Sequence, residues 1–200
     1  MSERRTQAER RAETQAAVLA SAGKLFGDKG YAQTSLEEIA GDCGISIAPI
    51  YHYFGNKKSL FQAVNEAMEA RILAPENPEF VKDEPDLGRW RWFLELCKDA
   101  RFRQIVLVDG PTILGLERLS ESRVSKAMLE RIEARFAVKG ALSSADGREG
   151  YKSALMGRMI VGALAEAGLF IGDAANPEQA CQDADELVAG LIQMLNSFSD

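Results

Sequence analysis

The sequence of 200 residues predicts an all-α protein. Apolar residues recur three and four positions apart along nearly the whole chain, and no long stretch alternates apolar and polar residues as a half-buried strand would. Prolines gather at Pro75, Pro78 and Pro85, where they break the chain into a connector. The length of 200 residues allows one large domain or a small domain joined to a medium one.

The first predicted helix spans about residues 9–29. One of its faces is apolar and carries Val18, Ala22, Leu25 and Phe26. Gly30 follows at the place where a left-handed residue commonly ends a helix. Thr34 and Ser35 each precede an acidic residue by three positions, so either can form a capping box at the start of a short second helix.

A third helix, about residues 47–53, follows the turn that contains Gly44. Ser46 stands as its predicted N-cap and Pro49 lies in its first turn. Proline is well tolerated there, because the backbone N–H that it lacks would have no partner within the helix. Two short helices joined by a glycine-containing turn, after a longer helix, are typical of a helix-turn-helix.

The third helix has an unusual exposed side. Residues expected to pack the two short helices together are Ile39, Ala40, Ile45 and Ile50, which leaves Ile47, Ala48, Pro49, Tyr51 and His52 on or near the surface. Small and apolar residues at an exposed helix start are odd unless they meet a partner such as a thymine methyl group. The pattern indicates DNA as the partner, and the alternative is that Ile47 and Ala48 belong to an ordinary core.

The fourth helix, from its Asn56 cap to about Leu73, begins with Lys57 and Lys58. The helix dipole disfavours a cation there by about 0.3–1 kcal/mol. A positive helix start with free N–H groups is a good phosphate clamp, so this local cost suggests a functional gain. The alternative is a solvated charge pair.

Five more helices are predicted at about residues 86–98, 100–108, 111–139, 147–172 and 177–198. Gly110-Pro111 separates the second of these from the third. Bulky apolar residues in this region could line a ligand pocket or simply form the core, and they are Trp90, Phe93, Leu96, Ile105, Ile113, Leu114, Phe136 and Met159. Asp109 and Arg158 lie in apolar runs, where they could form a structural ion pair or orient a ligand.

The last two helices each carry a stripe of small and apolar residues. The first stripe has Gly157, Val161, Leu164, Ala165 and Gly168, and the second has Leu187, Gly190, Leu191, Met194 and Phe198. Two such helices from each of two chains can close a four-helix bundle. A core within one chain is the alternative.

Composition excludes several classes of protein. The net charge of −6 argues against non-specific coating of nucleic acid, and residues 1–61 hold eight basic and seven acidic side chains, so the remainder carries −7. Cys43, Cys97 and Cys181 are too scattered for a disulfide framework or a zinc site, and His52 is the only histidine. We expect no cofactor, no metal, no enzymatic activity, no export signal and no membrane span, hence a cytoplasmic protein.

Residues 34–60 resemble the signature of the TetR family. The matching segments are Thr34-Ser35-Leu36-Glu37-Glu38-Ile39-Ala40, Cys43-Gly44-Ile45-Ser46, and Ile50-Tyr51-His52-Tyr53-Phe54-Gly55-Asn56-Lys57-Lys58-Ser59-Leu60. This resemblance implies that Thr34, Tyr51 and Lys57 contact phosphates, and that Ile47, Ala48, Pro49 and Tyr53 face bases or the nearby backbone. Ser46 and His52 complete the predicted DNA-binding set.

Two positions depart from the family pattern. Many relatives have a polar residue and a glycine where this chain has Ile47 and Ala48, which offer no hydrogen bond to a base. Recognition of the DNA sequence is therefore expected to depend on van der Waals contact and on DNA shape. A looser resemblance continues through Arg89-Trp90-Arg91-Trp92-Phe93, residues 105–111 and Leu114-Gly115.

The resemblance implies a DNA-binding domain at residues 1–56 and an effector-binding and dimerisation domain at residues 57–200. The expected partners are double-stranded DNA, a small-molecule effector and a second copy of the chain. A homodimer would place two recognition helices in successive major grooves of a palindromic operator, about 34–36 Å apart, and a mainly apolar effector would release it. Repression is the expected outcome, and the alternatives are control by a protein partner or an enzyme that uses the C-terminal cavity.

Overall fold

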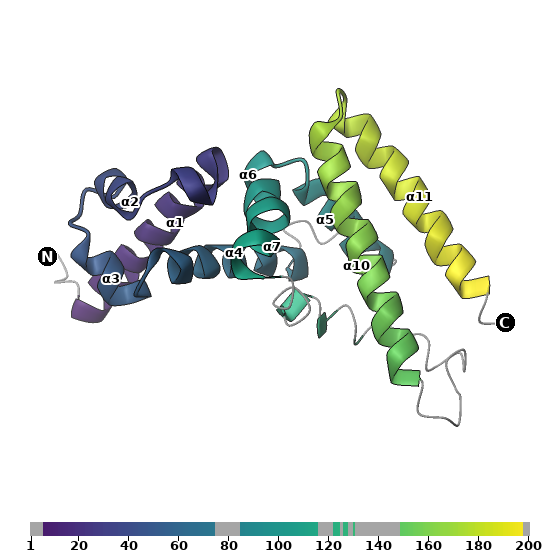
Figure 1. Cartoon of the computed structure of the whole chain (residues 1–200), viewed down its shortest axis with the longest axis horizontal. Coiled ribbons are helices and arrows are strands. Elements are labelled where there is room, and N and C mark those ends of the chain that lie inside the picture. The colour runs from purple at the N-terminus through teal and green to yellow at the C-terminus, as the bar shows by residue number, and fades with distance from the viewer. Residues whose placement is uncertain are drawn as a thin grey trace, which may run out of the picture. The chain divides into compact units, whose positions relative to one another are not determined.

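The structure is a computed structural model that describes residues 6–74, 85–115, 122–124, 126–127, 130 and 149–197. Every regular element in these ranges is a helix, which confirms the predicted fold class (Figure 1). The chain forms two compact units, the first made of residues 1–68 with 100–114 and the second of residues 69–99 with 115–200. The predicted domain limits, 1–56 and 57–200, stay a prediction, because compactness groups residues 100–114 with the N-terminal helices.

Helix α1 (Gln7–Gln33) opens the first unit. It begins with a capping box in which the Glu9 N–H donates to Thr6 Oγ1 at 3.2 Å and the Thr6 N–H donates to Glu9 Oε2 at 2.6 Å. Gly30, with φ 78° and ψ 165°, leaves the helical region and kinks the last turn. The predicted interruption at Gly30 is thus confirmed, although helical residues continue to Gln33.

Helix α2 (Leu36–Asp42) and helix α3 (Ala48–Phe54) form the predicted helix-turn-helix. Ser35, rather than Thr34, caps α2, because its hydroxyl accepts the Glu38 N–H at 3.1 Å. Gly44 takes φ 64° in the turn. The residues that pack the pair together include the buried side chains of Ile39, Ala40 and Ile50.

The predicted N-cap of α3 is wrong. Ile47 occupies the cap position, and no side chain caps the helix. Ile47 already has helical angles (φ −68°, ψ −24°), and its carbonyl accepts the N–H groups of Ile50 and Tyr51. Ser46 therefore lies one residue outside the helix. Pro49 does stand in the first turn, as expected.

Helix α4 (Lys57–Leu73) starts as predicted, since Asn56 Oδ1 accepts the Ser59 N–H at 2.9 Å. Its Phe61 ring meets Phe26 of α1 edge to face, with centroids 5.2 Å apart. Leu60, Phe61 and Val64 are buried. The aromatic contact fixes the start of α4 against the C-terminal half of α1.

Residues 100–114 complete the first unit as α6 (Ala100–Phe102), the π-helix η2 (Arg103–Asp109) and α7 (Gly110–Leu114). The predicted break at Gly110-Pro111 is wrong, because Gly110 is helical (φ −52°, ψ −58°) and its N–H donates to Ile105 O. Pro111 is tolerated in the first turn of α7. The chain leaves the helix at Gly115, with φ 95°, so the single helix expected over 111–139 is interrupted there.

The second unit contains α5 (Pro85–Leu96), α10 (Glu149–Asp173) and α11 (Pro177–Ser197). Helices α10 and α11, green and yellow in Figure 1, form an antiparallel pair, and α5 packs against both. The Arg91 guanidinium binds Asp185 at 2.9 Å, and Lys98 binds Glu178 at 2.8 Å. Within the described residues, no helix is both long enough and apolar enough to cross a bilayer.

Candidate nucleic-acid interface

A hollow of about 440 Å³ opens where the end of α1 meets the starts of α2 and α4 and the middle of α3. Its lining is Ala32, Gln33, Thr34, Ser35, Leu36, Glu37, Tyr51, Asn56 and Lys57. Three of these residues, Thr34, Tyr51 and Lys57, are the predicted phosphate contacts. The fold therefore brings together residues that the sequence separates by up to 23 positions.

Lys57 is held in place by an aromatic ring. Its Nζ lies 4.3 Å from the centroid of the Tyr31 ring, within the range of a cation–π contact. Such a contact contributes about 0.5–1 kcal/mol near the surface, comparable to the cost of placing a cation in the first turn of a helix. Among the described residues, the first turn of α4 contains no acidic side chain. Lys57 is thus an oriented cation rather than one member of a solvated pair.

The exposed side of α3 follows the prediction in part. Ser46, Ala48, Tyr51 and His52 are exposed, whereas Ile47, Pro49 and Tyr53 are half-buried. The exposed Ala48 is incompatible with the alternative in which this residue belongs to a core. The His52 and Tyr53 rings meet edge to face at 5.1 Å.

Thr34 is turned inward. It is 2% exposed, and its hydroxyl donates to the carbonyls of Leu25 at 3.1 Å and Gly30 at 2.9 Å. This hydroxyl is engaged inside the fold, and the phosphate contact at Thr34 stays a prediction. Thr34 thus ties the segment before α2 to the end of α1, and it is one of the residues that line the hollow.

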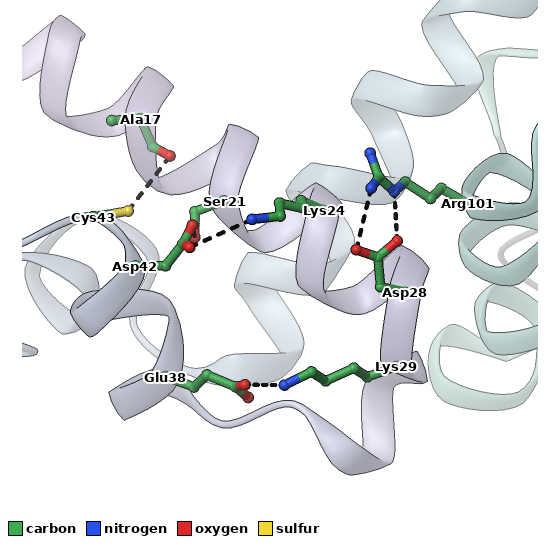
Figure 2. A network of polar contacts seen from close by, with 9 residues as sticks. All are labelled: Ala17, Ser21, Lys24, Asp28, Lys29, Glu38, Asp42, Cys43 and Arg101. Atoms are coloured by element: carbon green, nitrogen blue, oxygen red, sulfur yellow. Dashed lines mark hydrogen bonds and ion pairs between the residues drawn. The ribbon is translucent and has the colours of Figure 1, made fainter.

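Polar contacts hold α2 against α1 (Figure 2). The Ser21 hydroxyl donates to Asp42 Oδ2 at 2.6 Å, and Lys24 Nζ lies 3.6 Å from Asp42 Oδ1. This hydrogen bond and the Lys24 charge lower the pKa of Asp42. Lys29 pairs with Glu38 at the other end of α2. The helix-turn-helix is therefore anchored to α1 at both ends of its first helix.

A second set of contacts joins α1 to α6. Asp28 receives two hydrogen bonds from the Arg101 guanidinium, at 2.6 and 3.2 Å, and these hold the pKa of the carboxyl below its usual value (Figure 2). A Cβ added to Gly27 would lie 2.5 Å from Arg101 Cβ. The two helices touch at this glycine, so α6 lies directly on the backbone of α1.

Asp109 has partners that the sequence did not suggest. Its Oδ2 accepts the backbone N–H of Tyr31 at 2.8 Å and the Gln104 Nε2 amide at 3.0 Å. Neither partner is the cation expected for a structural ion pair. Asp109 lies in the first unit, where it closes the kink of α1.

The predicted ligand-binding residues are divided between the two compact units. Trp90, Phe93 and Leu96 are buried in the second unit, whereas Ile105, Asp109, Ile113 and Leu114 belong to the first. Met159 is 66% exposed, and its predicted role at a ligand stays a prediction. Phe136 and the side chain of Arg158 lie outside the described residues.

Trp90 is the most informative of these residues. It is 5% exposed, its ring stacks on Phe93 with centroids 5.9 Å apart, and its indole N–H has no hydrogen-bond partner among the described residues. An unsatisfied buried N–H costs about 1–3 kcal/mol, so it favours an acceptor at this place. No cluster of three or more His, Cys, Asp or Glu side chains that could hold a metal ion occurs in the described part of the chain.

Two family models match this chain. Residues 18–64 match bacterial regulatory proteins of the tetR family, and residues 87–195 match the tetracyclin repressor-like C-terminal domain. The first match contains the helix-turn-helix and the start of α4. The second includes α5, η2, α7, α10 and most of α11.

Individual relatives agree with the family models. The HTH-type transcriptional regulator TtgR of Pseudomonas putida is 35% identical over 108 residues, which is 51% of this chain and 51% of that protein. A TetR-family regulator from Pectobacterium atrosepticum has a crystal structure with 27% identity and a TM-score of 0.63, covering 94% of this chain and 95% of that one.

A third comparison shows the fold alone. NalD of Pseudomonas aeruginosa, the secondary repressor of the MexAB-OprM multidrug efflux pump, is 21% identical, with a TM-score of 0.58 over 89% of this chain and 94% of that one. The chain spans about half the length of curated relatives such as TtgR and the probable regulator ArpR, both of Pseudomonas putida.

Proposed function

This chain belongs to the TetR family of bacterial regulatory proteins, and from that membership we propose that it is a ligand-responsive repressor that binds a palindromic DNA operator as a homodimer. The observation that carries the DNA-binding part is the hollow shared by Tyr51 and Lys57 beside the exposed start of α3. Helix α3 enters the major groove, and the hollow receives a phosphate of the flanking backbone.

The electrostatics of this arrangement favour a phosphate. Lys57 supplies a positive charge at the N-terminus of a 17-residue helix, where the dipole already attracts anions. Tyr51 is 51% exposed and brings a hydroxyl donor to the same hollow. Ala48 then lies against the base edges without a polar group, so discrimination depends on shape and on contact with thymine methyl groups.

Exposed apolar side chains on α10 and α11 support the homodimer. Leu155, Met159 and Phe170 of α10 are 59%, 66% and 66% exposed, and Leu187 of α11 is 71% exposed. Gly162 and Gly190 have open space where a Cβ would stand. Large apolar groups gathered on two neighbouring helices are expected at an interface rather than in water.

On α10 this outward surface differs from the predicted stripe, whereas on α11 the predicted Leu187 and Gly190 are part of it. Leu164 and Gly168 of that stripe are buried within the chain. The helix face proposed for the partner is therefore the one that carries Leu155, Met159 and Phe170. The burial of Gly157, Leu191 and Met194 lies outside the description, as does the whole of Phe198.

The effector is proposed to be a mainly apolar molecule that carries at least one hydrogen-bond acceptor. Trp90 and Phe93 offer a stacked aromatic pair, and the unpartnered indole N–H of Trp90 is a donor for a carbonyl, hydroxyl or phenolate oxygen. Such an effector releases DNA by binding better to the form of the dimer that does not fit the operator.

Selection of bound fragments from random duplex DNA tests the DNA-binding part. The wild-type protein should enrich a sequence with two-fold symmetry, because a closed dimer presents two equivalent α3 helices. If no sequence is enriched and no duplex is retained, the proposal is wrong.

A screen of apolar metabolites tests the effector. A true effector raises the melting temperature and releases the selected duplex in the same concentration range. Trp90→Phe keeps an aromatic ring and removes the N–H, so it should weaken both responses about tenfold, as expected for one buried hydrogen bond. Unchanged responses of that variant would remove Trp90 as the polar anchor.

A further inference from the structure

We propose that Asp109 is a positioning residue for DNA binding, which fixes Tyr31 and thereby holds the Lys57 ammonium at the phosphate hollow. This inference rests on the proposed function, because it requires that Lys57 contact DNA. The residues involved lie within the first compact unit, although Asp109 and Tyr31 are separated by 78 positions in the sequence.

The first step is the kink at Gly30. With ψ 165° at this residue, the following N–H, that of Tyr31, is turned out of the helical direction. Asp109 Oδ2 accepts this N–H at 2.8 Å, and Gln104 Nε2 holds the same oxygen at 3.0 Å. The positive φ favours glycine here, and a Cβ on Gly30 would also lie 3.3 Å from Gln104 Nε2, tighter than most real contacts.

The second step is the Tyr31 ring. It stacks on Phe26 with centroids 5.8 Å apart and meets Phe61 edge to face at 5.1 Å. Lys57 Nζ lies 4.3 Å from its centroid. The backbone of Tyr31 is thus fixed from η2 and its ring from α1 and α4, and the ring in turn orients the cation that lines the hollow.

The third step is the π-helix that carries Asp109. Ile105 O accepts both the Gly110 N–H and the Asn65 Nδ2 amide, the latter at 3.1 Å. A Cβ at Gly110 would lie 2.9 Å from Asn65 Nδ2. Because this turn contains one extra residue, its conversion to an α-helical turn would rotate Asp109 by about 100° and withdraw the carboxylate from Tyr31.

A double-mutant cycle on the duplex selected by the wild-type protein tests this inference. Affinity is measured over a range of salt concentrations for Asp109→Ala, Lys57→Ala and the double variant. Asp109→Ala should weaken binding roughly five- to tenfold and flatten the salt dependence, as loss of a phosphate contact does. When Lys57 is already replaced by alanine, Asp109→Ala should weaken binding to the duplex by less than about twofold, because the cation that Asp109 positions is gone.

Asp109→Asn is the matched control. The amide keeps an oxygen for the Tyr31 N–H, so its affinity and salt slope should stay near those of the wild type. If Asp109→Ala fails to fold, Tyr31→Leu replaces it in the cycle, because leucine keeps the backbone N–H and removes the ring. That variant should show the same dependence on Lys57.

The outcomes separate the two proposals. Equal losses with and without Lys57, or an unchanged salt slope, would show that Asp109 only stabilises the fold, and would overturn this inference while leaving DNA binding intact. Failure of the wild-type protein to bind any duplex would overturn the proposed function and this inference together.

Discussion

Lys57 is the residue that supplies the positive charge of the proposed phosphate contact. Lys57→Ala should weaken binding to all duplexes by a similar factor and lower the salt slope by about one, because a phosphate contact releases counterions without reading sequence. Equilibrium titrations at several salt concentrations provide the measurement. Lys126→Ala removes the same charge from an exposed position of the second unit and is the control. A Lys57→Ala slope equal to that of the wild type would remove this residue from the contact set.

A substitution of Ala48 tests how the protein recognises the sequence of its DNA. Its methyl group is exposed at the first residue of α3, so Ala48→Leu should change the free energy of unfolding by less than about 0.5 kcal/mol. The larger side chain should nonetheless lower operator affinity and shift the preferred sequence, because it occupies space next to the bases. Selection repeated with this variant measures the shift. An unchanged preferred sequence and affinity would mean that α3 is not the reading helix.

The surroundings of single side chains could be predicted from the sequence only in part. Tyr51 and Lys57 were predicted from a local pattern, and the structure brings both to one hollow. Ser46 was assigned wrongly as a cap, because the start of α3 depends on the backbone angles of Ile47. The burial of Thr34 was not foreseen, because it depends on packing between α1 and α2. Asp109 and Tyr31 were not paired at all. No local period connects residues 78 positions apart.

At the scale of elements, the contact between α1 and α6 depends on the missing side chain of Gly27. Gly27→Ala should destabilise the fold by about 1–3 kcal/mol, because the new Cβ would lie 2.5 Å from Arg101 Cβ and force α6 to move. Denaturant unfolding gives the difference. Gly41→Ala in α2 is the control, since a Cβ there meets nothing within 4 Å and alanine favours a helix by about 1 kcal/mol. Equal effects of the two changes would contradict the close packing.

The Asp28–Arg101 pair also predicts how stability depends on pH. The folded protein holds the pKa of Asp28 below its ordinary value of 3.8, so the pair stabilises the fold above that value and loses this contribution as pH falls through the lower, folded-state pKa. Asp28→Asn should therefore reduce stability near neutral pH and reduce the loss of stability on acidification below 3.8. Melting temperatures measured across this range test the sign. A steeper acid loss in the variant would contradict it.

The element boundaries that could be predicted were those set by local chemistry. The interruption at Gly30 and the Asn56 cap of α4 both depend on a residue and its immediate neighbours. The π-helix η2 could not be foreseen, because its wide turn is supported by Asn65 of another helix. A glycine followed by a proline suggested a break at 110–111, and tertiary contact overrode that signal.

For the whole molecule, helical periodicity and the helix-turn-helix pattern were sufficient to predict the fold class and the order of the helices. The division into units was harder. Residues 100–114 follow α5 in the sequence but pack with α1, through Arg101 on Asp28 and Asp109 on Tyr31. Such a return of the chain depends on long-range polar pairs. Composition and periodicity contain no signal for it.

Association of two chains is the prediction that belongs to this largest scale. Met159→Glu places a charge on the exposed apolar face of α10, and because Met159 is 66% exposed the single chain should still fold. In a dimer that buries this face, the two symmetry-related charges would be desolvated near each other, which costs more than the interface gains. Sedimentation should show monomers. Affinity for the full operator should fall to that of a single DNA-binding domain, because the second domain no longer belongs to the same complex. Met159→Leu keeps the apolar surface and should remain dimeric with wild-type affinity. A Met159→Glu protein that still sediments as a dimer would place the interface on another face of the chain.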